Sequence, residues 1–160
     1  MRVGHGFDAH RLVEDRKLIL AGVTIPSDRG ALGHSDADAV AHALADALLG
    51  AAALNDLGSR YPASDERWKD ADSMMLLEQC ASAVREAGYR IENVDATIVV
   101  ERPKLAPHID KMRANIAQRL NLDIAQVGLK AKTSEGMGYT GDGSGIAVHV
   151  VALLERSPGT

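Results

Sequence analysis

An aspartate and a histidine near the N-terminus are the first residues of this chain that could bind a metal ion. Asp8 and His10 are separated by one residue in "MRVGHGFDAH", which alternates as a β-strand does. Positions i and i+2 of a strand point to the same face, so both side chains can reach one ion. A zinc site usually takes three ligands from the protein. A polar edge strand or a turn would also explain the pair, so both interpretations stay open.

His42 is the third candidate ligand. It lies in "HSDADAVAHALADALLGAAAL", an alanine-rich run that begins with a capping-box pattern, with Ser35 as N-cap and Asp38 three residues on. Asp38, His42 and Asp46 are four residues apart and form one line along the predicted helix. Either this line is a solvated face, or His42 binds metal while Asp38 or Asp46 accepts the proton of its second ring nitrogen.

His34 and Ser35 directly precede this predicted helix. Unpaired backbone N–H groups and the helix dipole favour an anion at such a position. A phosphate there would lie beside the metal ligands and bridge to the ion. The alternative is that Ser35 is an ordinary N-cap and His34 a loop residue.

A second polar segment, "KAKTSEGMGYTGDGSG", lies near the C-terminus and combines Lys132, Thr133, Ser134 and Glu135 with several glycines. It contains no GxxxxGK[ST] pattern and is therefore not a P-loop. The segment is either a plain turn between strands or a phosphate-holding loop. In the second case Glu135 would bind a cation that prefers oxygen ligands, such as magnesium.

Hydrophobic periodicity predicts the elements that position these residues. We expect strands at 2–10, 93–100, 126–133 and 145–155, a hairpin at 17–25, helices at 34–54, 74–87 and 107–121, and a long loop at 55–72. This order predicts an α+β fold, a single domain over residues 1–160, with a mixed β-sheet covered on one face by helices. The aliphatic strands of the uncovered face predict self-association through the sheets.

Composition excludes several classes of protein. The chain has 160 residues, a net charge of −4 and 3% aromatic residues, without a basic cluster, so we expect no nucleic-acid partner. No apolar stretch is long enough for a membrane span. The single Cys80 lies in an amphipathic run, which indicates a buried thiol in a reduced, cytoplasmic protein. Nucleophilic catalysis has little support because no G-x-S-x-G elbow is present.

Four segments together resemble the 2-C-methyl-D-erythritol 2,4-cyclodiphosphate synthase family: "GHGFDAH", "GHSDADAVAHALADALLGAAALNDLG", "ERPKLAPHI" and "KAKTSEGMGYTGDGSGI". They follow in the family's order and cover nearly the whole chain. The resemblance implies a metal-dependent lyase of the non-mevalonate isoprenoid pathway. It would cyclise 4-diphosphocytidyl-2-C-methyl-D-erythritol 2-phosphate to 2-C-methyl-D-erythritol 2,4-cyclodiphosphate and release CMP. It also implies a homotrimer with active sites between subunits.

The resemblance also assigns metal ions and substrate contacts to residues. Three of them, Asp8, His10 and His42, would hold a zinc-type ion, and Glu135 a magnesium or manganese ion at the substrate phosphates. His34 and Thr133 would stabilise the transition state. The substrate-binding positions implied are Ser35, Asp56, Leu57, Gly58, Tyr61, Pro62, Ala63, Ser64, Asp65, Val100, Glu101, Arg102, Pro103, Lys104, Leu105, Ala106, Lys132, Ser134 and Tyr139.

The chain departs from the family pattern at Asp142 and Ser144, where an arginine and a glutamate are common at the mouth of a central trimer cavity that can hold an isoprenoid diphosphate. Asp142 would repel a diphosphate, so we expect no such effector. We expect His5 and His149 to form a polar pair there instead.

Two other functions remain as alternatives. A metallohydrolase would use the same metal ligands to activate water and would need Asp38 or Asp46 as its base. A trimeric binding module for isoprenoid diphosphates would have no catalytic activity, and Asp142 argues against it.

Overall fold

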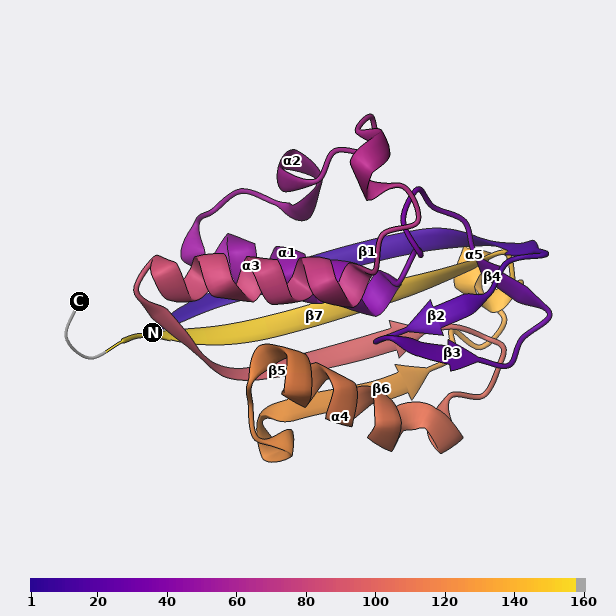
Figure 1. The fold of residues 1–160 in the computed structure, drawn as a ribbon. Helices are drawn as coiled ribbons and strands as arrows, with labels where there is room; N and C mark the ends of the chain where they lie inside the picture. The colour runs from indigo at the N-terminus through magenta and orange to yellow at the C-terminus, as the bar shows by residue number, and fades with distance from the viewer. Residues whose placement is uncertain (158–160) are drawn as a thin grey trace.

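The central sheet is built on two long antiparallel strands, β1 (Arg2–Glu14) and β7 (Gly145–Arg156), which lie side by side in the computed structural model; it describes residues 1–157 (Figure 1). Strand β5 (Tyr89–Val99) pairs antiparallel with β7, and β6 (Val127–Lys132) pairs parallel with β5. The short β4 (Arg29–Ala31) pairs with the end of β1. The order β4-β1-β7-β5-β6 confirms a mixed sheet.

Three helices cover one face of this sheet: α1 (Ala39–Ala52), α3 (Ser73–Glu86) and α4 (Ile109–Leu120). They lie in front of the strands in Figure 1, with α1 over β1 and β7. The predicted hairpin is confirmed as a separate two-stranded sheet of β2 (Leu18–Leu20) and β3 (Val23–Ile25). The α+β prediction is therefore confirmed.

Two short helices lie where the sequence predicted only loops. The predicted loop 55–72 contains α2 (Leu57–Arg60) and a 3₁₀ turn at Glu66–Trp68, and the glycine-rich turn contains α5 (Gly138–Gly141). Two further 3₁₀ turns, Ala106–His108 and Ile124–Gln126, flank α4. Elements of a single turn carry too few residues for a hydrophobic period, so the pattern could not reveal them.

Helix α1 begins at Ala39, and the predicted N-cap was wrong. The cap is Asp38, whose carboxylate accepts the N–H groups of Val40 and Ala41. Its two oxygens also accept the N–H groups of Ala21 and Gly22 in the β2–β3 turn, at 2.9 and 2.7 Å. Four donors satisfy this fully buried carboxylate, which ties the hairpin to the helix.

The contact between β1 and α1 depends on two glycines. A Cβ on Gly4 would lie 1.9 Å from the carbonyl oxygen of Ala47, and one on Gly6 would lie 1.9 Å from that of Ala43. The two glycines thus make room for the backbone of α1 to approach β1 closely. This contact brings the helix onto the face of β1 that carries the candidate ligands.

The opposite face of the sheet has no cover within residues 1–157. Val3 is 69% exposed there, and Phe7 and Val151 are each 47% exposed. The alternation predicted for β1 is thus confirmed, because Gly4 and Gly6 are buried while Val3, Phe7 and their odd-numbered neighbours face outward. Among the residues described, no helix is long and apolar enough to cross a membrane.

Candidate metal centre

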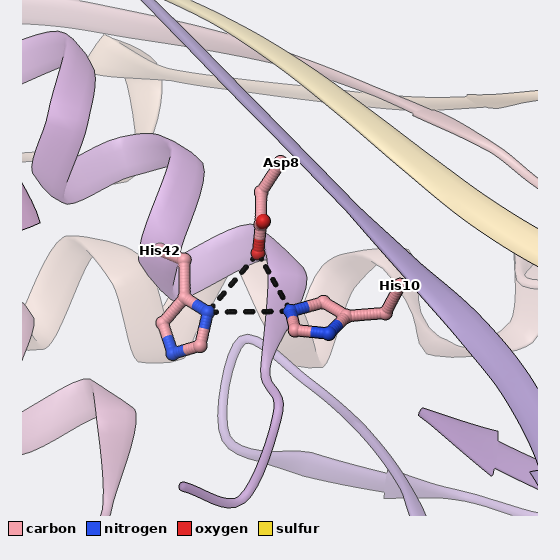
Figure 2. A group of neighbouring side chains, drawn as sticks. All are labelled: Asp8, His10 and His42. Carbon is pink, nitrogen blue, oxygen red and sulfur yellow. Dashed lines mark hydrogen bonds and ion pairs between the residues drawn. The ribbon is translucent and has the colours of Figure 1, made fainter. Parts of the chain in front are cut away.

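Asp8 and His10 from β1 and His42 from α1 converge on one point, as Figure 2 shows. The Asp8 Oδ2 atom lies 2.8 Å from His10 Nε2 and 3.0 Å from His42 Nδ1, and the two nitrogens are 3.4 Å apart. Ligands about 2.1 Å from a tetrahedral ion lie roughly 3.4 Å from one another. The three atoms therefore fit a divalent ion after a small outward movement, with a fourth position free for a further ligand.

Hydrogen bonds on the outer side of each imidazole fix its tautomer. The carbonyl of Leu32 can only accept, so His10 Nδ1 carries a proton and donates to it at 2.8 Å. Ser73 donates its hydroxyl proton to Asp36, so its oxygen accepts from His42 Nε2 at 2.8 Å. Both inward nitrogens thus present lone pairs toward the Asp8 carboxylate. Three electron-rich atoms facing one another require a cation.

The ionisation of the group points to the same conclusion. Burial alone would raise the pKa of Asp8, but hydrogen bonds and charges from His10 and His42 outweigh it and lower the pKa to about 2. Burial also opposes a proton on His10, yet Asp8 outweighs this and raises the pKa of that imidazole. Below this raised pKa and without a metal ion, a proton on His10 places a positive charge beside Asp8. A metal ion must displace that proton, so its affinity falls as the pH drops through the pKa of His10.

The predicted outer partners of His42 were wrong. Asp38 faces the β2–β3 turn, and Asp46 accepts the N–H of Leu57 at 2.7 Å, which fixes the start of α2. The second ring nitrogen of His42 instead donates to the hydroxyl oxygen of Ser73, which is 31 residues away in the sequence. The hydroxyl oxygen of Ser35 lies 3.2 Å from the same nitrogen. No local pattern marks Ser73, because this residue at the start of α3 approaches His42 only when α3 packs against α1.

Ser73→Ala is expected to weaken zinc binding by about 10- to 100-fold, because the substitution removes the acceptor that fixes the tautomer of His42. Competition with a chromophoric chelator measures the affinity. Ser82→Ala is the matched control, since this exposed serine of the same helix donates only to the backbone carbonyl of Glu78. Unchanged zinc affinity in Ser73→Ala would contradict the role of the Ser73 hydroxyl.

A cavity of about 180 Å³ opens beside the metal centre. Its lining contains seven of the predicted site residues and two that sequence reasoning missed, Trp68 and Leu76; the seven are His34, Ser35, His42, Leu57, Gly58, Tyr61 and Ala63. Tyr61 and Trp68 pack edge to face with ring centroids 4.9 Å apart. The indole N–H of Trp68 has no hydrogen-bond partner among residues 1–157. The cavity therefore has aromatic side chains in its wall.

Other predicted residues of the 55–72 segment support the cavity from outside. Asp56 caps α2 by accepting the N–H of Ser59, and the backbone carbonyl of Asp65 accepts from His34 Nε2 at 3.3 Å. Pro62 and Ser64 are exposed and do not line the cavity. Asp38 already accepts the N–H groups of Val40 and Ala41, so these N–H groups do not hold the anion expected at the start of α1, while the phosphate contacts of the His34 and Ser35 side chains stay a prediction.

The remaining predicted residues form a second group at the ends of β5 and β6. Parallel strands end at the same edge of a sheet, and the N–H of Val100 donates to the carbonyl of Lys132 at 3.0 Å. Thr133 donates to the exposed carboxylate of Glu135 at 3.3 Å. The other predicted members follow the same strand ends; they are Glu101, Arg102, Pro103, Lys104, Leu105, Ala106, Ser134 and Tyr139.

The two groups are not joined by polar contacts within one chain. No hydrogen bond or ion pair in the described part of the chain joins the second group to the side chains of Asp8, His10 and His42 or to the cavity residues. The side chains of the strand-end group therefore give the metal centre no polar contact from the same chain, although the ring of Tyr139 and the backbone of His10 both approach Gly145.

Comparison with known proteins finds close relatives. Residues 1–155 match the YgbB family. The 2-C-methyl-D-erythritol 2,4-cyclodiphosphate synthase of Trichlorobacter lovleyi is 54% identical over 154 residues, covering 96% of this chain and 98% of its own. The synthase of Moorella thermoacetica is 57% identical over 160 residues, covering 99% and 98%. A solved structure of a 2C-methyl-D-erythritol-2,4-cyclodiphosphate synthase in a CDP-bound form is 39% identical, with a TM-score of 0.89, and covers 96% of this chain and 100% of that one.

Proposed function

Because the chain belongs to the YgbB family, we propose that it is a metal-dependent phosphorus–oxygen lyase of isoprenoid biosynthesis. It converts 4-diphosphocytidyl-2-C-methyl-D-erythritol 2-phosphate into 2-C-methyl-D-erythritol 2,4-cyclodiphosphate and CMP. The observation that carries this proposal is the convergence of Asp8, His10 and His42 beside a cavity. The matches to the synthases of Trichlorobacter lovleyi and Moorella thermoacetica each span 98% of the relative's length. We therefore propose the complete activity for this chain.

In the proposed reaction an oxygen of the 2-phosphate attacks the β-phosphorus of the diphosphate. The new P–O bond closes the ring, while the bond from the β-phosphorus to the bridging oxygen breaks and its electron pair leaves with CMP. The attacking oxygen is already anionic, so no general base is needed. The remaining task is to align two negatively charged phosphates, which requires positioning and charge neutralisation.

Asp8, His10 and His42 would hold a zinc-type ion, and the exposed carboxylate of Glu135 a magnesium or manganese ion shared with the substrate phosphates. When bound, such cations polarise phosphate oxygens and neutralise developing charge.

Protein groups of the cavity and of the strand-end group would then orient the substrate. His34 and Thr133 would donate hydrogen bonds to phosphate oxygens in the transition state. The loop from Tyr61 to Asp65 would lie over the erythritol, and Lys132 would neutralise a phosphate, as the resemblance implies. The segment 100–106, which follows β5, would bind the cytosine and Asp56 the ribose, as the resemblance implies.

The alternative metallohydrolase loses the base it would need. Asp38 and Asp46 were its candidates, and both carboxylates are engaged by backbone N–H groups away from the metal centre. Incubation with the substrate and magnesium, followed by phosphorus NMR, tests the function. CMP with a cyclic diphosphate is expected. A linear phosphate product would favour hydrolysis, and absence of turnover in the zinc-loaded protein would overturn the enzyme assignment.

We also propose a homotrimer in which the uncovered sheet faces meet. Two observations support it: the exposed apolar side chains on that face, and the separation of the predicted site into two groups that one chain does not join. A neighbouring chain would bring its β5–β6 strand ends to the metal centre of the first.

Val151→Glu is expected to produce monomers without turnover, because it places a charge in an apolar interface. Zinc binding should persist, since the zinc ligands all come from one chain. Sedimentation velocity measures the assembly. Ile124→Glu is the control, because Ile124 is similarly exposed, at 45%, on a 3₁₀ turn next to α4. A Val151→Glu protein that sediments like the wild type would contradict assembly through this face.

The location and domain extent stay predictions. Cys80 is fully buried, and burial raises the pKa of its thiol to about 11, which supports the expected inert thiol of a cytoplasmic protein. The predicted single domain spans residues 1–160, of which the last three lie outside the described residues.

A further inference from the structure

Two histidines meet on the uncovered face of the sheet, far from any role in the proposed reaction. His5 on β1 and His149 on β7 come from neighbouring strands, where His149 is opposite Phe7 and His5 is opposite Val151. The two imidazoles are therefore diagonal neighbours. His149 Nδ1 lies 3.4 Å from His5 Nε2, and both side chains are exposed. The predicted contact between the two side chains is confirmed within one chain, while its place at a trimer cavity stays a prediction.

The distance between His149 Nδ1 and His5 Nε2 is long for a hydrogen bond. An N–H donor in a protein lies about 2.7–3.2 Å from its acceptor, and 3.4 Å exceeds that range. The same separation of 3.4 Å is found between His10 Nε2 and His42 Nδ1, the two imidazole ligands of the candidate metal centre. It is also roughly the distance between two ligands of a tetrahedral ion. The spacing of the pair therefore fits two nitrogens that bind one ion.

The surroundings hold the pair in place without competing for it. The ring of Phe7 packs against that of His149 with centroids 4.9 Å apart, and β1 and β7 pair continuously from Arg2 to Arg11. Among residues 1–157, neither imidazole makes another hydrogen bond, so no partner must be given up when an ion binds. Preorganised ligands lose little conformational entropy on binding.

We propose that His5 and His149 form a second metal site, a two-imidazole clip for a divalent transition-metal ion such as Zn²⁺, Ni²⁺ or Cu²⁺. Imidazole nitrogen favours these ions over Mg²⁺ and Ca²⁺, which prefer oxygen ligands. The remaining coordination positions are filled by water or by imidazoles of neighbouring copies. The site does not depend on the proposed reaction, because both ligands belong to one chain and lie on the face opposite the catalytic group.

Titration of the zinc-loaded protein with Ni²⁺, by calorimetry, tests this site. The wild type is expected to bind additional Ni²⁺ without releasing zinc, which a colorimetric zinc indicator monitors. His5→Ala and His149→Ala are each expected to weaken this Ni²⁺ binding by more than about 10-fold, because a clip of two ligands cannot lose one and keep its affinity. His108→Ala, on a 3₁₀ turn next to α4, is the matched control and should bind Ni²⁺ as the wild type does.

The stoichiometry reports how the clip is completed. One Ni²⁺ per chain corresponds to completion by water and one per three chains to completion by neighbouring copies, and either value supports the clip. The proposal is overturned if the wild type binds no Ni²⁺ beyond the zinc centre, if both sheet-face variants retain wild-type affinity, or if His108→Ala is weakened equally. Circular dichroism of each variant checks that folding is intact. Because the readout is binding rather than turnover, its failure is distinct from failure of the proposed function.

Discussion

His42→Ala is expected to abolish tight zinc binding and turnover while leaving the chain folded. The substitution removes one of three ligands, so the affinity for zinc should fall by more than about 100-fold, which is the upper end of the loss when only an outer partner of a ligand is removed. The fold should persist because His42 is only partly buried and makes its side-chain contacts within the polar site. Alanine is also the better helix former, which favours α1.

The measurement is zinc content after dialysis against a weak chelator, together with circular dichroism and the phosphorus NMR assay. His108→Ala is again the control, because it removes an imidazole outside the centre and should retain zinc. Full zinc stoichiometry in His42→Ala would remove His42 from the ligand set. Loss of both zinc and helical signal would instead show that the ligand also stabilises the fold, and Ser73→Ala would then separate the two effects.

Gly6→Ala is expected to reduce the free energy of unfolding by about 3 kcal/mol or more, at the upper end for overpacking of a well-packed core. The added Cβ would lie 1.9 Å from the carbonyl oxygen of Ala43, and this backbone group belongs to a helix that cannot move alone. Any relief must shift α1 away from β1. Because His42 lies on α1 and its fellow ligands Asp8 and His10 on β1, the same shift should also weaken zinc binding.

Urea unfolding, followed by circular dichroism, gives the stability. Gly50→Ala provides a matched control, because this glycine lies within α1 and a Cβ there meets nothing within 4 Å. The control should gain up to about 1 kcal/mol from the higher helix propensity of alanine. A Gly6→Ala protein with the urea midpoint of the wild type would show that α1 does not rest on β1 as closely as the structure places it.

The sequence by itself predicted the parts of this protein that local pattern encodes. The alternation of β1 placed Asp8 and His10 on one face, and the helix predicted at 34–54 supplied His42 as the candidate third ligand. Strand and helix periods are visible in sequence because each repeats over two to four residues. The resemblance to known synthases then gave the activity and the remaining site residues, which periodicity alone could not assign.

Only the tertiary structure decided which groups support the metal ligands. Asp38 was predicted to accept the second ring proton of His42, but its carboxylate instead caps α1 and binds the β2–β3 turn. Ser73, which donates to Asp36, accepts that proton in its place. The close contact between Gly6 and the backbone of α1 at Ala43 likewise depends on tertiary packing. A hydrogen-bonding side chain takes whichever partner the packed helices bring within about 3 Å. That partner depends on contacts between segments tens of residues apart, and no local period records them.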